Sequence, residues 1–223
     1  MTRSVAGRSR PLPPLLPGLA LIAAGLAVLL IGAVATSRYP FAFDRTIIVG
    51  LRQWSGPSWL PKAAGDITAL GGGVVLTLVV VIVAGFLLVQ RLWLTALATV
   101  LATLTGGGVV DLVKGVVLRA RPDLVPHLVS ANGYSFPSGH ATSSAVVYLT
   151  LASLASQVTP DRTARLYLLV VAVLLVGAIG CSRVYLGVHW PSDVLAGWSF
   201  GTLWALGWWT ATARARVAIG GER

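Results

Sequence analysis

Long uninterrupted apolar runs dominate the chain. They cover 18–36, 71–89, 92–113, 139–157, 166–181 and 194–213. Runs of about 18 or more apolar residues are typical of membrane-spanning helices. The fifth run is short, so we expect its helix to extend into the flanking residues. The pattern therefore predicts an all-α protein built as a bundle of six transmembrane helices.

The polar positions between these runs predict two further features. Only Gln90 and Arg91 separate the second run from the third, which indicates a tight helical hairpin. Between the first and second runs, apolar residues recur at helical spacing from Thr46 to Trp54. Such a segment is typical of an amphipathic helix at a membrane surface. We therefore expect a short interfacial helix between the first two spans.

The apolar region leaves room for one domain. We expect a membrane domain over 18–213, a cytoplasmic segment over 1–17 and a cytoplasmic tail over 214–223. A secretory signal is the alternative interpretation of the first run, because Ala33-Val34-Ala35 resembles a cleavage site. The run is longer than the roughly 7–15 apolar residues of a signal, which favours an uncleaved helix.

The charge of the chain is strongly positive, with 17 Lys and Arg against 7 Asp and Glu and a net charge of +10. In a soluble protein this excess would suggest nucleic acid. Beside membrane spans, the cations are expected to flank the cytoplasmic ends of the helices. We therefore expect the bilayer, and no nucleic acid, as a partner. The single cysteine, Cys181, excludes an intramolecular disulfide.

The positive charges also bear on orientation. Six spans place both termini on one side, and this side carries nine arginines against eight Lys and Arg on the other. Four of those eight lie in the segments that carry the candidate chemistry: Lys114, Arg119, Arg121 and Arg183. Without them, the termini face the cytoplasm under the positive-inside rule. The Arg, Ala and Gly bias suggests a bacterial genome, so we expect a multi-pass protein of the bacterial cytoplasmic membrane with an outward-facing site.

The first candidate segment follows the third apolar run. Lys114 and Arg121 are seven residues apart, which in a helix places both on one face two turns apart, with Pro122 ending the helix or turning the chain. Two cations on one face suit an anionic group, and Arg grips phosphate with two hydrogen bonds. Plain flanking charge is the alternative. Arg119 lies off this face and is expected to contact solvent or lipid headgroups.

The second segment is Pro137-Ser138-Gly139-His140, at the start of the fourth run. Pro and Ser before an apolar run are helix-start signals. Backbone N–H groups at a helix start bind phosphate, and Gly139 allows a ligand to approach closely. The Ser138 hydroxyl adds a donor, and His140 would lie over the same anion. An interfacial histidine is the alternative.

The third segment runs from Ser182 and Arg183 to His189 and Asp193. Pro191 marks a helix start, and Asp193, four residues after His189, can fold back to the imidazole. A carboxylate on one ring nitrogen leaves the other nitrogen free as a nucleophile. Arg183 supplies a third cation for phosphate.

Together, the segments read Lys-x6-Arg-Pro, Pro-Ser-Gly-His and Ser-Arg-x5-His-x3-Asp, in that order. This combination resembles the type-2 phosphatidic acid phosphatase family, whose fold also occurs in bacterial acid phosphatases and vanadium haloperoxidases. The resemblance implies that His189 attacks phosphorus, Asp193 orients it, and His140 protonates the leaving oxygen and then activates water. It implies that the phosphoryl oxygens are bound by Lys114, Arg121, Ser138, Gly139 and Arg183. No metal and no cofactor are expected.

The expected function is a metal-independent membrane lipid phosphatase that acts through a phosphohistidine. Candidate substrates are polyprenyl diphosphates or monophosphates, phosphatidic acid and phosphatidylglycerophosphate, since motifs that hold only phosphate do not choose among them. A phosphotransferase that passes the phosphate to another acceptor is the alternative. A non-enzymatic transporter or scaffold would not need both histidines and Asp193.

Overall fold

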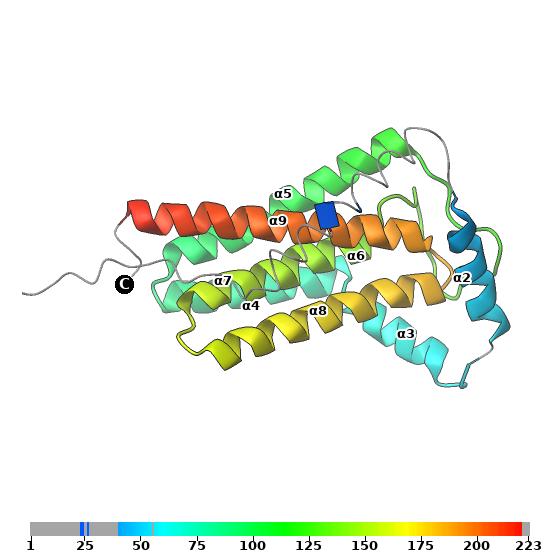
Figure 1. Ribbon diagram of the computed structural model, residues 1–223, viewed down its shortest axis with the longest axis horizontal. Helices are drawn as coiled ribbons and strands as arrows, with labels where there is room; N and C mark the ends of the chain where they lie inside the picture. The colour runs from blue at the N-terminus through cyan, green and yellow to red at the C-terminus, as the bar shows by residue number, and fades with distance from the viewer. Residues whose placement is uncertain (1–22, 25, 27–39, 55, 220–223) are drawn as a thin grey trace, which may run out of the picture.

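The computed structural model describes residues 23, 24, 26, 40–54 and 56–219. All regular elements in this part of the chain are helices, which confirms the predicted all-α class there. Figure 1 shows the long helices side by side along the long axis, with α2 and α3 at one end. The expected span over 18–36 and segment over 1–17 lie outside the described residues, except for three helical positions at 23, 24 and 26.

The elements follow one another with short connections, apart from a long segment between α5 and α6. In chain order they are α2 (Ala42–Gln53), α3 (Leu60–Ala69), α4 (Gly73–Val89), α5 (Trp93–Val117), α6 (Gly139–Ser144), η1 (Ala145–Leu149), α7 (Thr150–Val158), α8 (Arg162–Tyr185) and α9 (Pro191–Ala218). The π-helical turn η1 joins α6 to α7, so these three form one continuous helical segment.

Three of the helical segments are long and apolar enough to cross a bilayer: Trp93–Val117, Gly139–Val158 and Arg162–Tyr185. The pair α3 and α4, bent by 46° at its junction, qualifies as a fourth candidate. Helix α9 has 28 residues, yet it does not qualify, because its Trp, Gly, Ser and Thr residues lower its hydropathy. The count of six spans therefore stays a prediction.

Several predicted features are present. The expected hairpin is confirmed, since α4 ends at Val89 and α5 begins at Trp93, with Arg91 in the left-handed region at φ 61°. Helix α8 extends the short fifth run at both ends, as expected. A helix also covers the predicted amphipathic segment except its last residue, Trp54, and it begins earlier, at Ala42. Its placement at a membrane surface stays a prediction. Helix α9 continues past residue 213 into the expected tail.

The second apolar run starts differently from the prediction. A separate helix, α3, precedes it, and the chain bends between Ala69 and Gly73. Gly71 packs so tightly in this bend that an added Cβ would lie 2.6 Å from Cγ2 of Ile179 and 3.5 Å from Cβ of His140. The Tyr148 hydroxyl donates to the Leu70 carbonyl at 2.8 Å and holds the bend against η1. The bend thus lies beside His140 of the second candidate segment.

The segment Gly139–Val158 is the centre of the bundle. In its most apolar stretch of 18 residues, 67% of the residues are buried. The corresponding shares are 33% for Trp93–Val117 and 28% for Arg162–Tyr185. It packs closely on α9, where a Cβ added at Gly197 would lie 2.8 Å from Oγ1 and 3.0 Å from the amide nitrogen of Thr142. Small residues allow such close approach of membrane helices. This contact joins the two helices that carry His140 and Asp193.

We expect Gly197→Ala to destabilise the protein, because its new methyl group collides with the backbone of Thr142. Overpacking of this kind costs about 1–3 kcal/mol. Gly207→Ala, on the same helix, is the matched control, since an added Cβ there meets nothing within 4 Å. Thermal unfolding of the purified proteins in detergent measures the difference. Equal melting temperatures for the two variants would contradict the close α6–α9 contact.

Candidate active site

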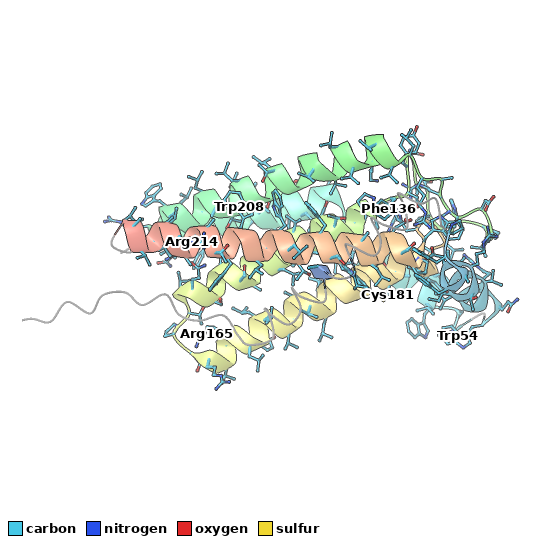
Figure 2. The ribbon with its side chains drawn as sticks, turned by 45° about the horizontal axis from the view of Figure 1, so that its top comes forward. Trp54, Phe136, Arg165, Cys181, Trp208 and Arg214 are labelled. Atoms are coloured by element: carbon cyan, nitrogen blue, oxygen red, sulfur yellow. The ribbon has the colours of Figure 1, made fainter. Side chains whose placement is uncertain are left out.

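The three candidate segments meet at one end of the bundle. Figure 2 places Phe136, just before Pro137-Ser138, and Cys181, just before Ser182-Arg183, toward the end where Trp54 and α2 lie. Arg165 and Arg214 lie at the opposite end. Residues more than 60 positions apart in the chain are in direct contact here, as in the pair Arg121 and His189.

His189 and Asp193 are brought together by the start of α9. Pro191 occupies the first turn of this helix, as predicted, and Asp193 accepts a hydrogen bond from the Trp190 amide at 2.9 Å. The same carboxylate oxygen, Oδ2, lies 3.4 Å from Nδ1 of His189. Both side chains are buried. The predicted fold-back of Asp193 to the imidazole is therefore present.

Arg121 settles which ring nitrogen of His189 carries the proton. Its Nη1 lies 3.1 Å from Nε2 of His189, and a guanidinium only donates hydrogen bonds. Nε2 therefore accepts, and the proton lies on Nδ1, facing Asp193. The guanidinium is oriented by carbonyl oxygens that it also contacts: Asn132 at 2.7 Å, Val188 at 2.8 Å and Gly133 at 3.0 Å.

Lys114 and Arg121 converge, but not for the predicted reason. Helix α5 ends at Val117, and Leu118 adopts a left-handed conformation at φ 52°, so Arg121 lies beyond the helix. The expectation of one shared helical face that ends at Pro122 is wrong. Both side chains nevertheless contact the Tyr134 carbonyl, Lys114 at 3.2 Å and Arg121 at 3.5 Å. A loop carbonyl, not helical periodicity, brings the two cations together.

The start of α6 lies next to these cations. Ser138 is the N-cap and its amide donates to the Asp193 carbonyl at 3.1 Å, which ties α6 to α9. A Cβ added at Gly139 would lie 3.7 Å from Nζ of Lys114. His140, in the first turn, faces the bend before α4, where its Nε2 would lie 3.9 Å from a Cβ added at Gly72.

Arg183 completes the set of cations. It is buried at the end of α8 and donates to Oγ1 of Thr68 at 3.1 Å, so α3 also contributes to the site. Lys114, Arg121 and Arg183 lie close enough to interact electrostatically. The buried atoms Nε of Arg183 and Oγ of Ser138 have no hydrogen-bond partner among the described residues.

The surroundings of His189 favour its neutral form. Burial lowers the pKa of His189 to about 4, and the positive charges of Arg121 and Arg183 act in the same direction. The hydrogen bond and negative charge of Asp193 oppose this shift only in part. At neutral pH the imidazole is therefore unprotonated at Nε2, whose lone pair accepts the hydrogen bond from Arg121. Burial also lowers the pKa of Arg121, which nevertheless remains charged.

Arg119 corrects one expectation. It was expected to contact solvent or headgroups, but only 3% of it is exposed. Its guanidinium donates to Asp193 at 2.6 Å and to Asp44 at 3.0 Å. Beyond Leu118 the chain has left the helix, so the helical-face argument that turned Arg119 outward does not apply.

Sequence reasoning missed four polar residues around this site. Asp44 and Ser192 bind Arg119, Ser135 donates to the Asp193 carboxylate, and Thr68 holds Arg183. Asp44 was the detectable one, because an acid inside an apolar membrane-associated segment is costly unless it is paired. Within the described residues, no three His, Cys, Asp or Glu side chains are grouped so that they could hold a metal ion.

The chain is similar to known proteins over the region that carries this site. A family model described as the PAP2 superfamily matches residues 92–216. Phosphatidylglycerophosphatase B of Bacillus subtilis is 36% identical over 148 residues, which cover 65% of this chain and 71% of that protein. Decaprenylphosphoryl-5-phosphoribose phosphatase of Mycobacterium tuberculosis is 32% identical over 115 residues, which cover 50% of this chain and 56% of that protein.

A solved structure is also similar. The crystal structure of a transmembrane PAP2-type phosphatidylglycerolphosphate phosphatase from Bacillus subtilis aligns with a TM-score of 0.71 and 30% identity. The alignment covers 86% of this chain and 93% of that one. The likeness therefore extends well beyond the three segments that carry the candidate site.

We expect His189 to make the stability of the protein depend on pH. The unfolded histidine binds a proton below about pH 6.5, whereas the folded one resists protonation until pH falls to about 4. The unfolded state therefore binds more protons in this window, so stability falls as the pH is lowered from about 6.5 to 4. Melting temperatures of the protein and of His189→Gln across this range test the effect. An identical pH dependence in both proteins would contradict it.

Proposed function

The chain belongs to the PAP2 superfamily, and we propose that it is a membrane phosphatase that removes a terminal phosphate from a lipid through a phosphohistidine on His189. Its similarity to named lipid and polyprenyl phosphatases supports activity on lipid phosphates. The histidine mechanism rests on the arrangement of the site.

The gathering of positive charge beside His189 carries this proposal. Lys114, Arg121 and Arg183 repel one another, and two buried donors, on Ser138 and Arg183, have no hydrogen-bond partner in the part of the chain that the structure describes. Leaving a buried donor unsatisfied costs about 1–3 kcal/mol. A phosphoryl group offers several acceptor oxygens and negative charge, so its binding would relieve both penalties. Phosphoryl transfer depends chiefly on such positioning and electrostatic stabilisation.

In the first step, Nε2 of His189 is the attacking atom. Its lone pair forms the bond to phosphorus while the bond between phosphorus and the leaving oxygen breaks. His140 gives a proton to that oxygen. Before substrate binds, Nε2 accepts a hydrogen bond from Nη1 of Arg121 at 3.1 Å. An arriving phosphoryl oxygen would accept this hydrogen bond instead, so the lone pair of Nε2 becomes available for attack. Asp193 holds the Nδ1 proton and stabilises the positive ring.

In the second step, a water molecule attacks the phosphorus of the phosphohistidine and gives a proton to His140. The bond between nitrogen and phosphorus breaks, its electron pair returns to Nε2, and inorganic phosphate leaves. The cations that bind the phosphoryl oxygens serve both steps, because negative charge develops on the same oxygens in each transition state. We propose that no metal ion takes part, since the three cations supply the charge stabilisation.

The position of the site supports a lipid substrate. It lies at one end of the apolar helices, where a headgroup phosphate would lie if the tail entered the bilayer. The opposite end carries Arg162 and Arg165 at the start of α8 and Arg214 and Arg216 at the end of α9. Under the positive-inside rule this basic end faces the cytoplasm. We propose that the site faces outward from the cytoplasmic membrane, with polyprenyl phosphates, phosphatidic acid and phosphatidylglycerophosphate as candidate substrates.

We expect the purified protein to release phosphate from lipid phosphates in the presence of EDTA, and His189→Ala to lose at least about a thousandfold in kcat, because it lacks the nucleophile. Assay of free phosphate over a panel of lipid phosphates in detergent measures both. His127→Ala, which changes a histidine in the long segment between α5 and α6, is the control and should retain activity. Turnover by His189→Ala, or loss of wild-type activity with EDTA, would refute the mechanism.

The orientation is testable with single cysteines in a Cys181→Ala background. We expect a membrane-impermeant maleimide to label Asp123→Cys in intact cells, because this exposed loop position lies at the same end of the helical bundle as the site. Arg162→Cys, at the opposite end, should react only after the cells are permeabilised. The reverse labelling pattern would show that the site faces the cytoplasm.

A further inference from the structure

A buried charge cluster lies behind the His189–Asp193 pair. Arg119 stands between two carboxylates, with Nη1 2.6 Å from Oδ1 of Asp193 and Nη2 3.0 Å from Oδ2 of Asp44. The side chain of Arg119 is 2% exposed and both carboxylates are fully buried. The guanidinium carbon also lies 5.5 Å from the ring centroid of Trp190, which directly follows His189 in the chain. A charge cluster buried this deeply is held in one geometry by its hydrogen bonds.

Asp44 is the member of this cluster that comes from furthest away in the chain. It caps α2 by accepting from the Phe41 amide at 3.1 Å. A cap alone does not require complete burial, and Asp44 makes three further contacts. It accepts from the amide and the hydroxyl of Ser192, at 2.8 and 2.7 Å, and from Arg119. Asp44 therefore holds the first turn of α9 by hydrogen bonds to Ser192, the residue directly before Asp193.

The arrangement has an electrostatic consequence for Asp193. One guanidinium faces two carboxylates, so Arg119 cannot neutralise both of them. Oδ1 of Asp193 is held by Arg119, while Oδ2 faces Nδ1 of His189. Without Asp44, the whole charge of Arg119 would act on Asp193, and less negative charge would remain to stabilise a positive imidazole.

We propose that Asp44 is a positioning residue for catalysis, which acts through Arg119 and Ser192 to hold the Asp193 carboxylate against His189 and to keep its negative charge available to the ring. Helix α2 thereby becomes part of the catalytic apparatus, although Asp44 precedes Ser192 by 148 residues. This inference rests on the proposed role of His189 as the nucleophile.

The first test compares Asp44→Asn with Asp66→Asn. Both changes remove one negative charge, but Asp66 is exposed on α3 and pairs with Lys62. We expect Asp44→Asn to lower kcat roughly 10- to 100-fold with less than about a threefold change in KM, because the transition state and not substrate binding depends on Asp193. Asp66→Asn should retain wild-type kcat. A normal kcat in Asp44→Asn, with only a lower melting temperature, would reduce Asp44 to a structural role and overturn the proposal.

The second test asks whether Asp44 acts through Arg119. Arg119→Lys keeps the charge but loses the planar fork that bridges two carboxylates. We expect this change alone to lower kcat, and Asp44→Asn to add less than about threefold in the Arg119→Lys background. Independent, multiplying effects in the double variant would contradict the proposed route. If Asp44→Asn does not fold, Arg119→Lys and Ser192→Ala, which change the residues through which Asp44 acts, test the proposal instead. A wild-type kcat in both would refute the positioning role.

The two proposals fail in different ways. If His189→Ala is inactive while Asp44→Asn and Arg119→Lys turn over normally, the lipid phosphatase mechanism stands and the positioning role of Asp44 falls. If His189→Ala retains turnover, the mechanism itself falls, whatever the Asp44 variants do. Measuring all of these variants on the same lipid phosphate in detergent separates the two results.

Discussion

The burial of the Asp193 carboxylate is the constraint on which the rest of the site depends. A buried charge costs several kcal/mol unless donors surround it. The donors come from three separate parts of the chain: Arg119 after α5, Ser135 before α6, and His189 with the Trp190 amide before α9. Satisfying this one carboxylate therefore draws all three candidate segments to the same place.

Close packing of small residues makes this convergence possible. Gly197 lets α9 approach the backbone of Thr142 on α6, and the Ser138 amide donates to the Asp193 carbonyl at the start of the same two helices. The bend at Gly71 brings α3 alongside, where Thr68 receives Arg183. The helices thus act as a frame for the charged side chains and for the proposed nucleophile.

Local sequence signals predicted much of this molecule, and their failures have a common cause. The hairpin at Gln90-Arg91, the extension of α8 and the contact between His189 and Asp193 all follow from periodicity or from four-residue spacing. The bend before α4 and the end of α5 at Val117 did not follow. Tyr148 holds the bend, and Ser135 and Asp193 hold the chain just after α5, and all three are distant in the sequence. Apolar runs show that helices form, but not where neighbouring elements bend or end them.

The sequence by itself determined the helical class, the candidate residues of the site and the pairing of His189 with Asp193, because short-range patterns and spacing set all of these. Only the tertiary structure decided the role of Arg119, which looked like a surface cation and proved to be buried between Asp44 and Asp193. The physical reason is distance along the chain. A buried charge needs partners, and those of Arg119 lie 74 and 75 residues away, where no local pattern can point to them.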